Sequence, residues 1–397
     1  MKNDWEIKKL GEVCEINIGR TPERGNFKMW DKEKKTENVW LSIADLNNTE
    51  NGYISDSTEY VSDNAVPKMK LVKANTLLMS FKLTIGRCAI TKRDLFTNEA
   101  IAALPILDKN LDLFFLKYYL ENFDWAKLTE GDVKVKGKTL NKEKLKEVPI
   151  TLPPLEEQKR IVKILDEKIA MLETVKANAK ANLQNAKDLF QSQLTKAFSN
   201  TTWEKKRLGD ICGVTDGDHM PPPKSKDGFP FITISDINKD TYTIDFSNTF
   251  YVPESYYNGL KENRKPKAGD VLYTVTGSYG IPVLVKDEIF CFQRHIGLLR
   301  PSEEIYSNFL FYWILSPEAK NQADDVATGA AQKTVSLGSL RNFEIPLPPL
   351  SEQKRIVKEL DTLSEKTKAL QDIYKKILLD CDELKQSLLQ KAFEGEL

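Results

Sequence analysis

The chain is an internal duplication. A shift of 195 residues places TLPPLEEQKRIVKILD (151–166) on PLPPLSEQKRIVKELD (346–361), and ten of the eleven positions from Pro153 to Lys163 are identical. A repeat of this length means that one structural unit is used twice. At 397 residues the chain is too long for one compact domain, so the duplication also indicates how it divides.

The repeat extends through the rest of each unit with small changes of offset. The matching segments are WEIKKLGEVCEI (5–16) with WEKKRLGDICGV (203–214), WLSIADL (40–46) with FITISDI (231–237), and KANTLLMSFKLTIG (73–86) with KAGDVLYTVTGSYG (267–280). Each unit therefore consists of a globular part followed by one copy of the strongly repeated block.

The globular parts have the pattern of mixed α/β domains. Short apolar runs such as Asn75–Phe81, Asp270–Val275 and Ile281–Val285 are broken by Gly, Pro and Asn, which favours many short strands. Each part also contains an aromatic segment, 111–123 or 306–317, that is long enough for a buried helix. We expect these aromatic side chains to pack in the core rather than to stack on bases.

A pair of prolines precedes a long helix in each unit. Pro153-Pro154 and Pro348-Pro349 can open a helix but not lie inside one, and the acidic residues that follow suit its first turn. We expect helices that begin near residues 155 and 350. Roughly 40 residues at about 1.5 Å each give a length of about 60 Å.

Apolar residues recur along both helices in alternating steps of three and four, which is typical of a coiled-coil seam. A single helix would expose this stripe, so we expect the two copies to pair with each other. The expected seam consists of Ile161, Leu165, Leu172, Val175, Ala179, Leu183, Ala186, Phe190 and Leu194 in the first helix and of Ile356, Leu360, Leu363, Leu370, Tyr374, Ile377, Cys381, Leu384 and Leu388 in the second.

Composition excludes several classes of protein. Lys+Arg and Asp+Glu both number 58, so a polyanionic partner has to be met by local patches. No apolar run approaches the roughly 18 residues of a membrane helix, and MKNDWEIKKL lacks the apolar core of a secretory signal. We expect a cytoplasmic protein with no membrane partner.

Five cysteines at least 70 residues apart suit reduced buried thiols, and with two histidines we expect no metal site.

One stretch imitates a nucleotide-binding loop. Residues 131–139, GDVKVKGKT, end in Gly-Lys-Thr, but five residues separate the two glycines where a phosphate-binding loop has four. The second copy places Gln332 opposite Gly137, so the glycine is not repeated. We expect no ATP site and no bound cofactor.

Other catalytic motifs are missing from the sequence. It contains no GxGxxG, HExxH, GxSxG or paired CxxC, and no Asn/Asp-Pro-Pro-aromatic motif of an amino-methyltransferase. His219 and His295 could act as acid or base, but each occurs in only one copy, and a polar contact fits them better. The pattern favours a binding module without catalysis of its own.

The two globular parts differ in net charge. Residues 1–155 hold 25 basic against 23 acidic residues, and residues 199–350 hold 16 against 19. Six lysines lie between Lys134 and Lys146, next to glycines that let a loop approach a phosphate backbone. A solvated surface explains such a run equally well. The corresponding segment 327–340 has only Lys333, together with small residues and hydroxyls.

The repeated (T/P)LPPLxEQKRIVKxLD block, followed each time by a long helix, resembles the specificity subunit of type I restriction-modification systems. The resemblance covers the whole chain, and the WxxxxLG(E/D)(V/I)C and (L/I)xIxD(L/I) segments are recognisable. It implies a pseudo-two-fold α/β protein in which two target recognition domains are joined by an antiparallel coiled coil. The implied boundaries are domain 1 at 1–152, helix 1 at 153–198, domain 2 at 199–347 and helix 2 at 348–397. An antiparallel pair would place Leu165 near 384–393 and Leu360 near 189–198.

The resemblance also implies partners. Each domain reads one half of a bipartite, asymmetric sequence in double-stranded DNA, and the coil sets the spacing of the half-sites. The chain itself does not catalyse a reaction. It assembles with two modification subunits, which methylate adenine with S-adenosylmethionine, and with restriction subunits, which hydrolyse ATP and cut DNA.

Candidate DNA readers are polar residues in the glycine-rich loops, because arginine can pair with guanine and lysine can contact phosphate. In the first domain they are Arg20, Thr21, Lys82, Arg87, Lys134, Lys136 and Lys138, and in the second Asp218, His219, Thr276, Ser278, Tyr279, Arg294 and Lys333. Two alternatives stay open: a coiled-coil scaffold that bridges proteins without DNA, and an enzyme with an unrecognised active site. Duplication of both globular parts favours paired binding over catalysis.

Overall fold

The computed structural model describes residues 5–50, 52–128, 133–134, 137–138, 140–200, 202–219, 222–330 and 332–397. The chain forms two compact units. Unit 1 comprises Met1–Asn178 and Ile377–Leu397, and unit 2 comprises Ala179–Lys376. Each unit therefore contains one globular part, the beginning of one long helix and the end of the other. The predicted α/β class with two long helices is confirmed.

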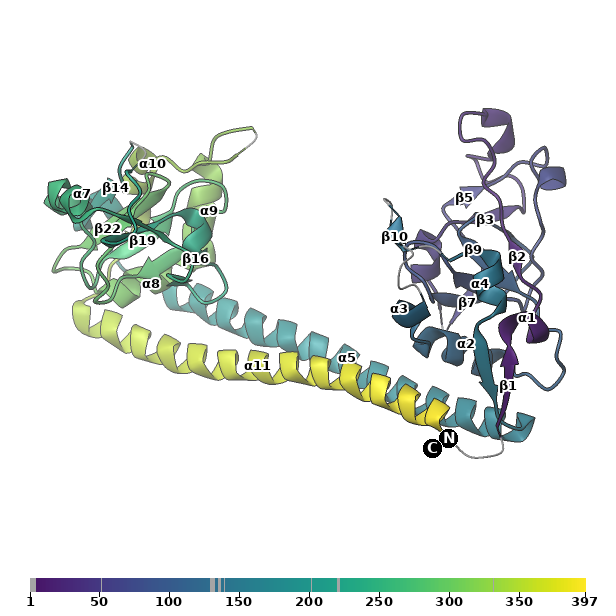
Figure 1. Cartoon of the computed structure of the whole chain (residues 1–397). Helices are drawn as coiled ribbons and strands as arrows, with labels where there is room; N and C mark the ends of the chain where they lie inside the picture. The colour runs from purple at the N-terminus through teal and green to yellow at the C-terminus, as the bar shows by residue number, and fades with distance from the viewer. Residues whose placement is uncertain are drawn as a thin grey trace. The chain divides into compact units, whose positions relative to one another are not determined.

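The globular part of unit 1 is built from short strands and helices (Figure 1). Its strands are β1 Glu6–Lys9, β2 Asn17–Ile18, β3 Val39–Leu41, β4 Tyr53–Ile54, β5 Glu59–Tyr60, β6 Leu77–Ser80, β7 Cys88–Thr91, β8 Phe96–Thr97, β9 Ile101–Leu104, β10 Val133–Lys134, β11 Gly137–Lys138 and β12 Pro149–Leu152. Its helices are α1 Leu10–Val13, α2 Leu113–Asn122, α3 Trp125–Leu128 and α4 Lys142–Lys146, with 3-10 turns η1 Phe27–Met29, η2 Ala44–Asn47 and η3 Val66–Lys68.

The globular part of unit 2 follows a similar order, with α7 and η5 added before β19. Its strands are β13 Lys205–Arg207, β14 Cys212–Asp216, β15 Phe229–Ile232, β16 Ile237–Asn238, β17 Thr243–Ile244, β18 Phe250–Val252, β19 Val271–Thr274, β20 Pro282–Leu284, β21 Cys291–Phe292, β22 Ile296–Pro301 and β23 Glu344–Pro346. Its helices are α6 Leu208–Ile211, α7 Glu254–Gly259, α8 Ser307–Ile314, α9 Pro317–Val326 and α10 Leu337–Arg341, with 3-10 turns η4 Ile234–Asp236 and η5 Glu262–Arg264.

The main sheets of the two units share four strand positions, and the sheet of unit 1 has β4 as an additional edge strand. In unit 1 a five-stranded sheet has the order β2-β9-β6-β7-β4, and unit 2 has the order β14-β22-β19-β20. A three-stranded sheet lies beside each, β5-β3-β8 in unit 1 and β18-β15-β21 in unit 2. In both, the central strand pairs antiparallel with one neighbour and parallel with the other. The duplication is therefore one of fold as well as of sequence.

The aromatic segments form the predicted buried helices. Helix α2 lies between the sheet of unit 1 and the long helices, and α8 holds the same place in unit 2 (Figure 1). The rings of Phe115 and Phe393 are 5.5 Å apart in unit 1, and those of Phe309 and Phe198 are 5.2 Å apart in unit 2. These aromatic residues pack in the core, as predicted. All five cysteines are buried, as predicted, and none forms a disulfide in the described residues.

A buried glutamine ties each globular part to a long helix. The side-chain amide of Gln158 donates to the carbonyl oxygens of Asn110 and Pro153, both at 2.8 Å, and its oxygen accepts from the N–H of Asp112 at 2.8 Å. Gln353 repeats all three bonds in unit 2. Buried amides need such complete pairing. The repeated EQKR sequence thus includes a residue that fixes the globular part on its helix.

The long helices are α5, Leu155–Phe198, and α11, Leu350–Glu394, and each begins just after its proline pair. In unit 1, Leu165 shares an apolar cluster with Leu389 and Ala392. In unit 2, Leu360 shares one with Leu194 and Phe198. The start of each helix therefore lies beside the end of the other, which confirms the antiparallel prediction. Among the described residues, no helix is long and apolar enough to cross a membrane.

The seam between the helices differs from the prediction in its middle. Val175, Leu370 and Leu384 were expected in the seam, but their side chains are exposed. Lys176 and Thr367 lie inward instead: Thr367 is buried, and the ammonium of Lys176 lies 2.7 Å from the Asp382 carboxylate. A lysine can pack its alkyl chain in a contact and still bring its charge to a partner.

Candidate nucleic-acid interface

Three segments of each globular part meet at one end of its sheets. In unit 1 they are residues 19–21, the β6–β7 loop at 81–87 and the turn at 98–100; we call them loop face 1. In unit 2 they are residues 217–219, the β19–β20 loop at 275–281 and the turn at 293–295, called loop face 2. Most of the predicted DNA readers lie on these two faces.

The same backbone hydrogen bonds assemble both faces. The N–H of Phe81 donates to Ala100 at 3.0 Å, and that of Val275 donates to His295 at 3.0 Å. A fourth segment then joins each face, because Leu140 N–H donates to Phe81 at 3.1 Å and Val335 N–H donates to Val275 at 2.8 Å. Segments far apart in the sequence are thereby fixed side by side, which a preformed binding surface requires.

A glycine lets two of the segments approach each other. A Cβ atom on Gly19 would lie 2.2 Å from the carbonyl oxygen of Thr97, and one on Gly217 would lie 2.0 Å from that of Phe292. No side chain fits at such a distance. Both copies therefore need glycine there, directly before the predicted readers Arg20 and Asp218.

Loop face 1 brings two of its predicted readers, Thr21 and Lys82, to Glu99. The hydroxyl of Thr21 donates to the Glu99 carboxylate, and the charge of Lys82 acts on the same group. Partial burial opposes ionisation of Glu99, but these partners hold the pKa of its carboxyl below the usual range. Arg20 is exposed and donates to the carbonyl oxygen of Lys68 at 3.4 Å.

Four further predictions in unit 1 are not brought to Glu99 by any described contact. Arg87 is exposed and donates to the side-chain oxygen of Asn47, so it faces η2. Lys136 lies outside the described residues, as does most of the glycine-lysine stretch at 131–139. Lys134 and Lys138 lie in the hairpin β10–β11, where the backbone alone is described. The three lysines remain predictions from the sequence.

Loop face 2 begins with a polar cluster. His219 Nε2 lies 2.8 Å from the Asp216 carboxylate, and Arg264 donates to the same carboxylate at 3.2 Å. Asp218 accepts a 3.0 Å hydrogen bond from Tyr256. Burial, together with this bond, raises the pKa of the Tyr256 phenol. The imidazole of His219 is held at the edge of the cluster, with its ring exposed to solvent.

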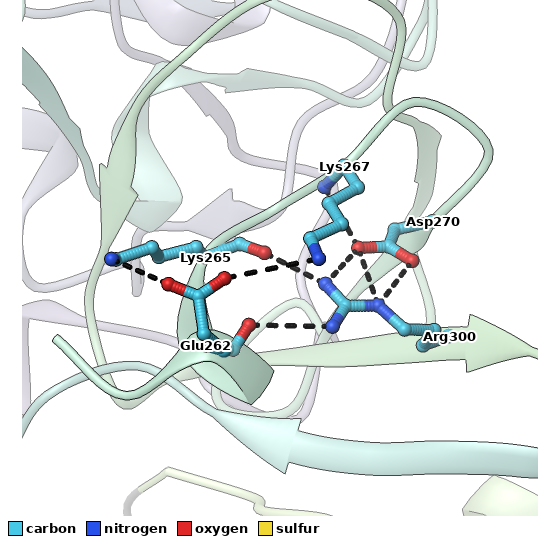
Figure 2. A network of polar contacts seen from close by, with 5 residues as sticks. All are labelled: Glu262, Lys265, Lys267, Asp270 and Arg300. Carbon is cyan, nitrogen blue, oxygen red and sulfur yellow. Dashed lines mark hydrogen bonds and ion pairs between the residues drawn. The ribbon is translucent and has the colours of Figure 1, made fainter.

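A partly buried ion pair between Arg300 and Asp270 helps to position Arg264. The guanidinium of Arg300 contacts both oxygens of Asp270, at 3.0 and 2.7 Å, and donates to the carbonyl oxygens of Lys265 and Glu262 (Figure 2). Glu262 in turn pairs with Lys265 at 2.7 Å. These contacts fasten η5, which carries Arg264, to strand β22. The network therefore helps to hold Arg264 beside the Asp216 carboxylate.

The other predicted readers of unit 2 lie along the β19–β20 loop and its neighbours. Thr276 is buried, 3.2 Å from Nδ1 of His295 and 3.4 Å from the Thr334 hydroxyl. Tyr279 donates to Asp324 at 2.5 Å, which raises the pKa of its phenol. The remaining three predicted readers have exposed side chains: Ser278, Arg294 and Lys333.

Sequence reasoning missed several members of the two faces. Glu99 aligns with the predicted reader Arg294 in the duplication. This alignment could have indicated that Glu99 belongs to the corresponding face of the first copy. Asp216 and Arg264 carry no motif of their own. His295 was not among the predicted readers, but the polar contact predicted for it is confirmed, because its Nδ1 lies 3.2 Å from the Thr276 hydroxyl. Among the described residues, no group of three His, Cys, Asp or Glu side chains could hold a metal ion.

Comparison with known proteins gives a consistent result. A family model described as "Type I restriction modification DNA specificity domain" matches residues 2–185 and again 200–379. The MjaVIII specificity subunit of Methanocaldococcus jannaschii is 24% identical, over 99% of this chain and 93% of its own. The EcoBI specificity subunit of Escherichia coli is 24% identical, over 76% of this chain and 69% of its own.

Two solved structures share the fold. A chain from a study of "complex assembly" and "conformational transition of the type I R-M system" has a TM-score of 0.80 at 21% identity and covers 100% of this chain and 99% of its own. The HsdS subunit from Thermoanaerobacter tengcongensis has a TM-score of 0.59 at 20% identity, over 100% of this chain and 98% of its own.

Proposed function

We propose that this chain recognises DNA, because it belongs to the type I restriction-modification DNA specificity family. Domain 1, residues 1–152, and domain 2, residues 199–347, each read one half of a bipartite sequence in double-stranded DNA. One observation carries the proposal: both loop faces are assembled by the same hydrogen bonds and present different side chains. A common scaffold with variable polar loops is suited to reading different base edges.

The two half-sites differ in sequence. Loop face 1 presents Arg20, and Lys82 beside the Glu99 carboxylate, whereas loop face 2 presents the His219 cluster and Arg294. Arginine pairs best with guanine, and a histidine held by a carboxylate presents its other nitrogen for a hydrogen bond. Since these groups are not repeated between the copies, the target is asymmetric.

The chain contributes recognition, and other subunits supply the chemistry. We propose that two modification subunits dock on the coiled coil and methylate adenine, and that restriction subunits join them to cut DNA in an ATP-dependent reaction. The exposed apolar side chains on the helices support such docking. In unit 1 Met171 is 60% exposed and Val175 45%. Apolar side chains gathered on one exposed face mark contact surfaces.

A mobility-shift experiment tests the proposal against the scaffold alternative. The full chain, with and without modification subunits from the same cells, is mixed with a duplex that carries the adenine-methylated sequence found in those cells. We expect a shift that a duplex with either half-site scrambled does not compete away. Binding of the modification subunits without any shift of DNA would support the scaffold.

A further inference from the structure

We propose that Leu83, in the β6–β7 loop, is an apolar wedge that enters the base stack of the half-site read by domain 1, an inference that rests on the proposed function. The loop joins β6 to β7 on loop face 1. Leu83 is 60% exposed and belongs to none of the apolar clusters of the described residues. Its side chain therefore contributes little to the core of unit 1.

The backbone at Leu83 is one that glycine prefers. Its φ is +66°, and the equivalent residue of the second copy, Gly277, has φ +72°. The loop ends the same way in both copies, at Gly86 with φ +87° and Gly280 with φ +88°. Both copies thus share one loop conformation, and only the first places a bulky residue at the disfavoured position. The strained backbone at Leu83 lies on the surface, where its side chain adds little to the stability of the fold. Such strain points to a functional role.

The surroundings of Leu83 favour nucleic acid as its contact. Lys82 precedes it, and the exposed Arg87 ends the loop. Such charges can hold phosphates while an apolar side chain opens the step between two bases, as leucine does in proteins that kink DNA. In unit 2 the equivalent position has no side chain, and Tyr279 after it is held by Asp324. The wedge is therefore a property of domain 1 alone.

Fluorescence of 2-aminopurine tests the insertion directly. The full chain is titrated into duplexes that carry the methylated target, each with one 2-aminopurine at a successive position through the first half-site. The wild-type chain should raise the fluorescence at one base step, because unstacked 2-aminopurine is bright. Leu83→Gly, which copies Gly277, should abolish that rise and weaken binding by about ten-fold. The slope of log affinity against log salt should not change, because no ionic contact is lost.

The control is Leu107→Gly, which removes an equally exposed leucine, 62% accessible, outside loop face 1. This variant should keep both the rise and the affinity. Sequence-specific binding by the wild type with no rise at any position would overturn the wedge and leave the proposed function standing, as would a rise that survives in Leu83→Gly. A wild-type chain that binds no duplex, alone or with modification subunits, would remove both.

Discussion

Single residues decide what each loop face can read. The two faces share backbone hydrogen bonds, but Thr21 and Glu99 stand where the second copy has His219 and Arg294. A change at these positions leaves the scaffold intact, because the scaffold depends on main-chain bonds and on Gly19 and Gly217. Specificity can therefore vary without loss of fold.

The lysines predicted from the sequence at 134–138 give a prediction about salt. If Lys134, Lys136 and Lys138 contact phosphates, changing all three to glutamine should flatten the slope of log affinity against log salt by roughly 0.9 per contact. The preferred sequence should stay the same, because phosphate contacts carry no base information. The matched control changes Lys35, Lys92 and Lys109, three exposed lysines outside the face. An unchanged slope would place the three lysines on a solvated surface.

Relief of backbone strain gives a prediction about stability. A residue other than glycine at positive φ destabilises the folded state by about 1 kcal/mol. Replacing it with glycine removes this cost, but the greater conformational freedom of glycine in the unfolded chain offsets part of the gain. We expect Leu83→Gly to raise the free energy of unfolding by roughly 0.5 kcal/mol in a urea titration. Gly277→Leu should lower it, because the backbone there has φ +72°, which a residue with a Cβ atom adopts only at a cost. A clear loss of stability in Leu83→Gly would mean that the leucine packs in the fold.

At the scale of elements, the buried glutamines hold the domains on the helices. Gln158 and Gln353 are completely buried, and each satisfies three backbone groups of its globular part and proline turn. A tyrosine adds a second tie in each unit, from Tyr118 to Asp166 and from Tyr312 to Asp361, both at 2.6 Å. The same contacts are thus used twice.

Loss of this glutamine should therefore be costly. Gln158→Ala leaves one N–H and two carbonyl groups without their partner, and we expect the free energy of unfolding to fall by about 3 kcal/mol. Gln184→Ala is the control on the same helix, because the exposed Gln184 bonds only to Asp188. It should change stability by less than about 0.5 kcal/mol. Equal effects in a urea titration would contradict the role of Gln158.

The outer surface of the coil gives a prediction about assembly. Glutamate at Met171 and Val175 should prevent binding of the modification subunit, because two charges would be buried against an apolar partner. The chain should stay folded, since both side chains are exposed. Ala170→Glu is the control, at an exposed position beside them on α5. Co-elution of the double variant with modification subunits on a sizing column would show that they dock elsewhere.

Elements were predictable from the sequence where local chemistry fixes them. The proline pairs placed the helix starts, and the aromatic runs placed α2 and α8. The middle of the seam was not predictable, because a rule that selects apolar residues chooses Val175 over Lys176, whose alkyl chain packs and whose charge meets Asp382. The loop faces were not predictable either. Thr21 and Glu99 are 78 residues apart, and only the paired sheets bring them together.

At the scale of the whole molecule, the duplication separates the proposed DNA recognition by the globular parts from the proposed assembly on the helices. Each globular part carries its own sheets, its own loop face and its own glutamine tie, so the two parts can change independently. The paired helices are shared. We therefore expect that exchanging one globular part changes the DNA sequence that is recognised and leaves assembly with the other subunits unchanged.

Exchange of one domain tests this separation. Replacing domain 2, residues 199–347, by that of a relative should change one half-site of the methylated target and leave the other as it was. The reciprocal exchange of domain 1, residues 1–152, is the matched control and should change the opposite half-site. A chimera whose two half-sites change together would mean that the domains do not read DNA separately.

Sequencing of methylated adenines tests the central claim most directly. The DNA is taken from cells that carry this chain with its modification subunits, and from the same cells without it. We predict that methylation dependent on the chain marks two different short sequences separated by a gap of fixed length and unspecified bases. A single continuous or palindromic motif, or methylation that does not depend on the chain, would contradict the reading of one half-site by each domain.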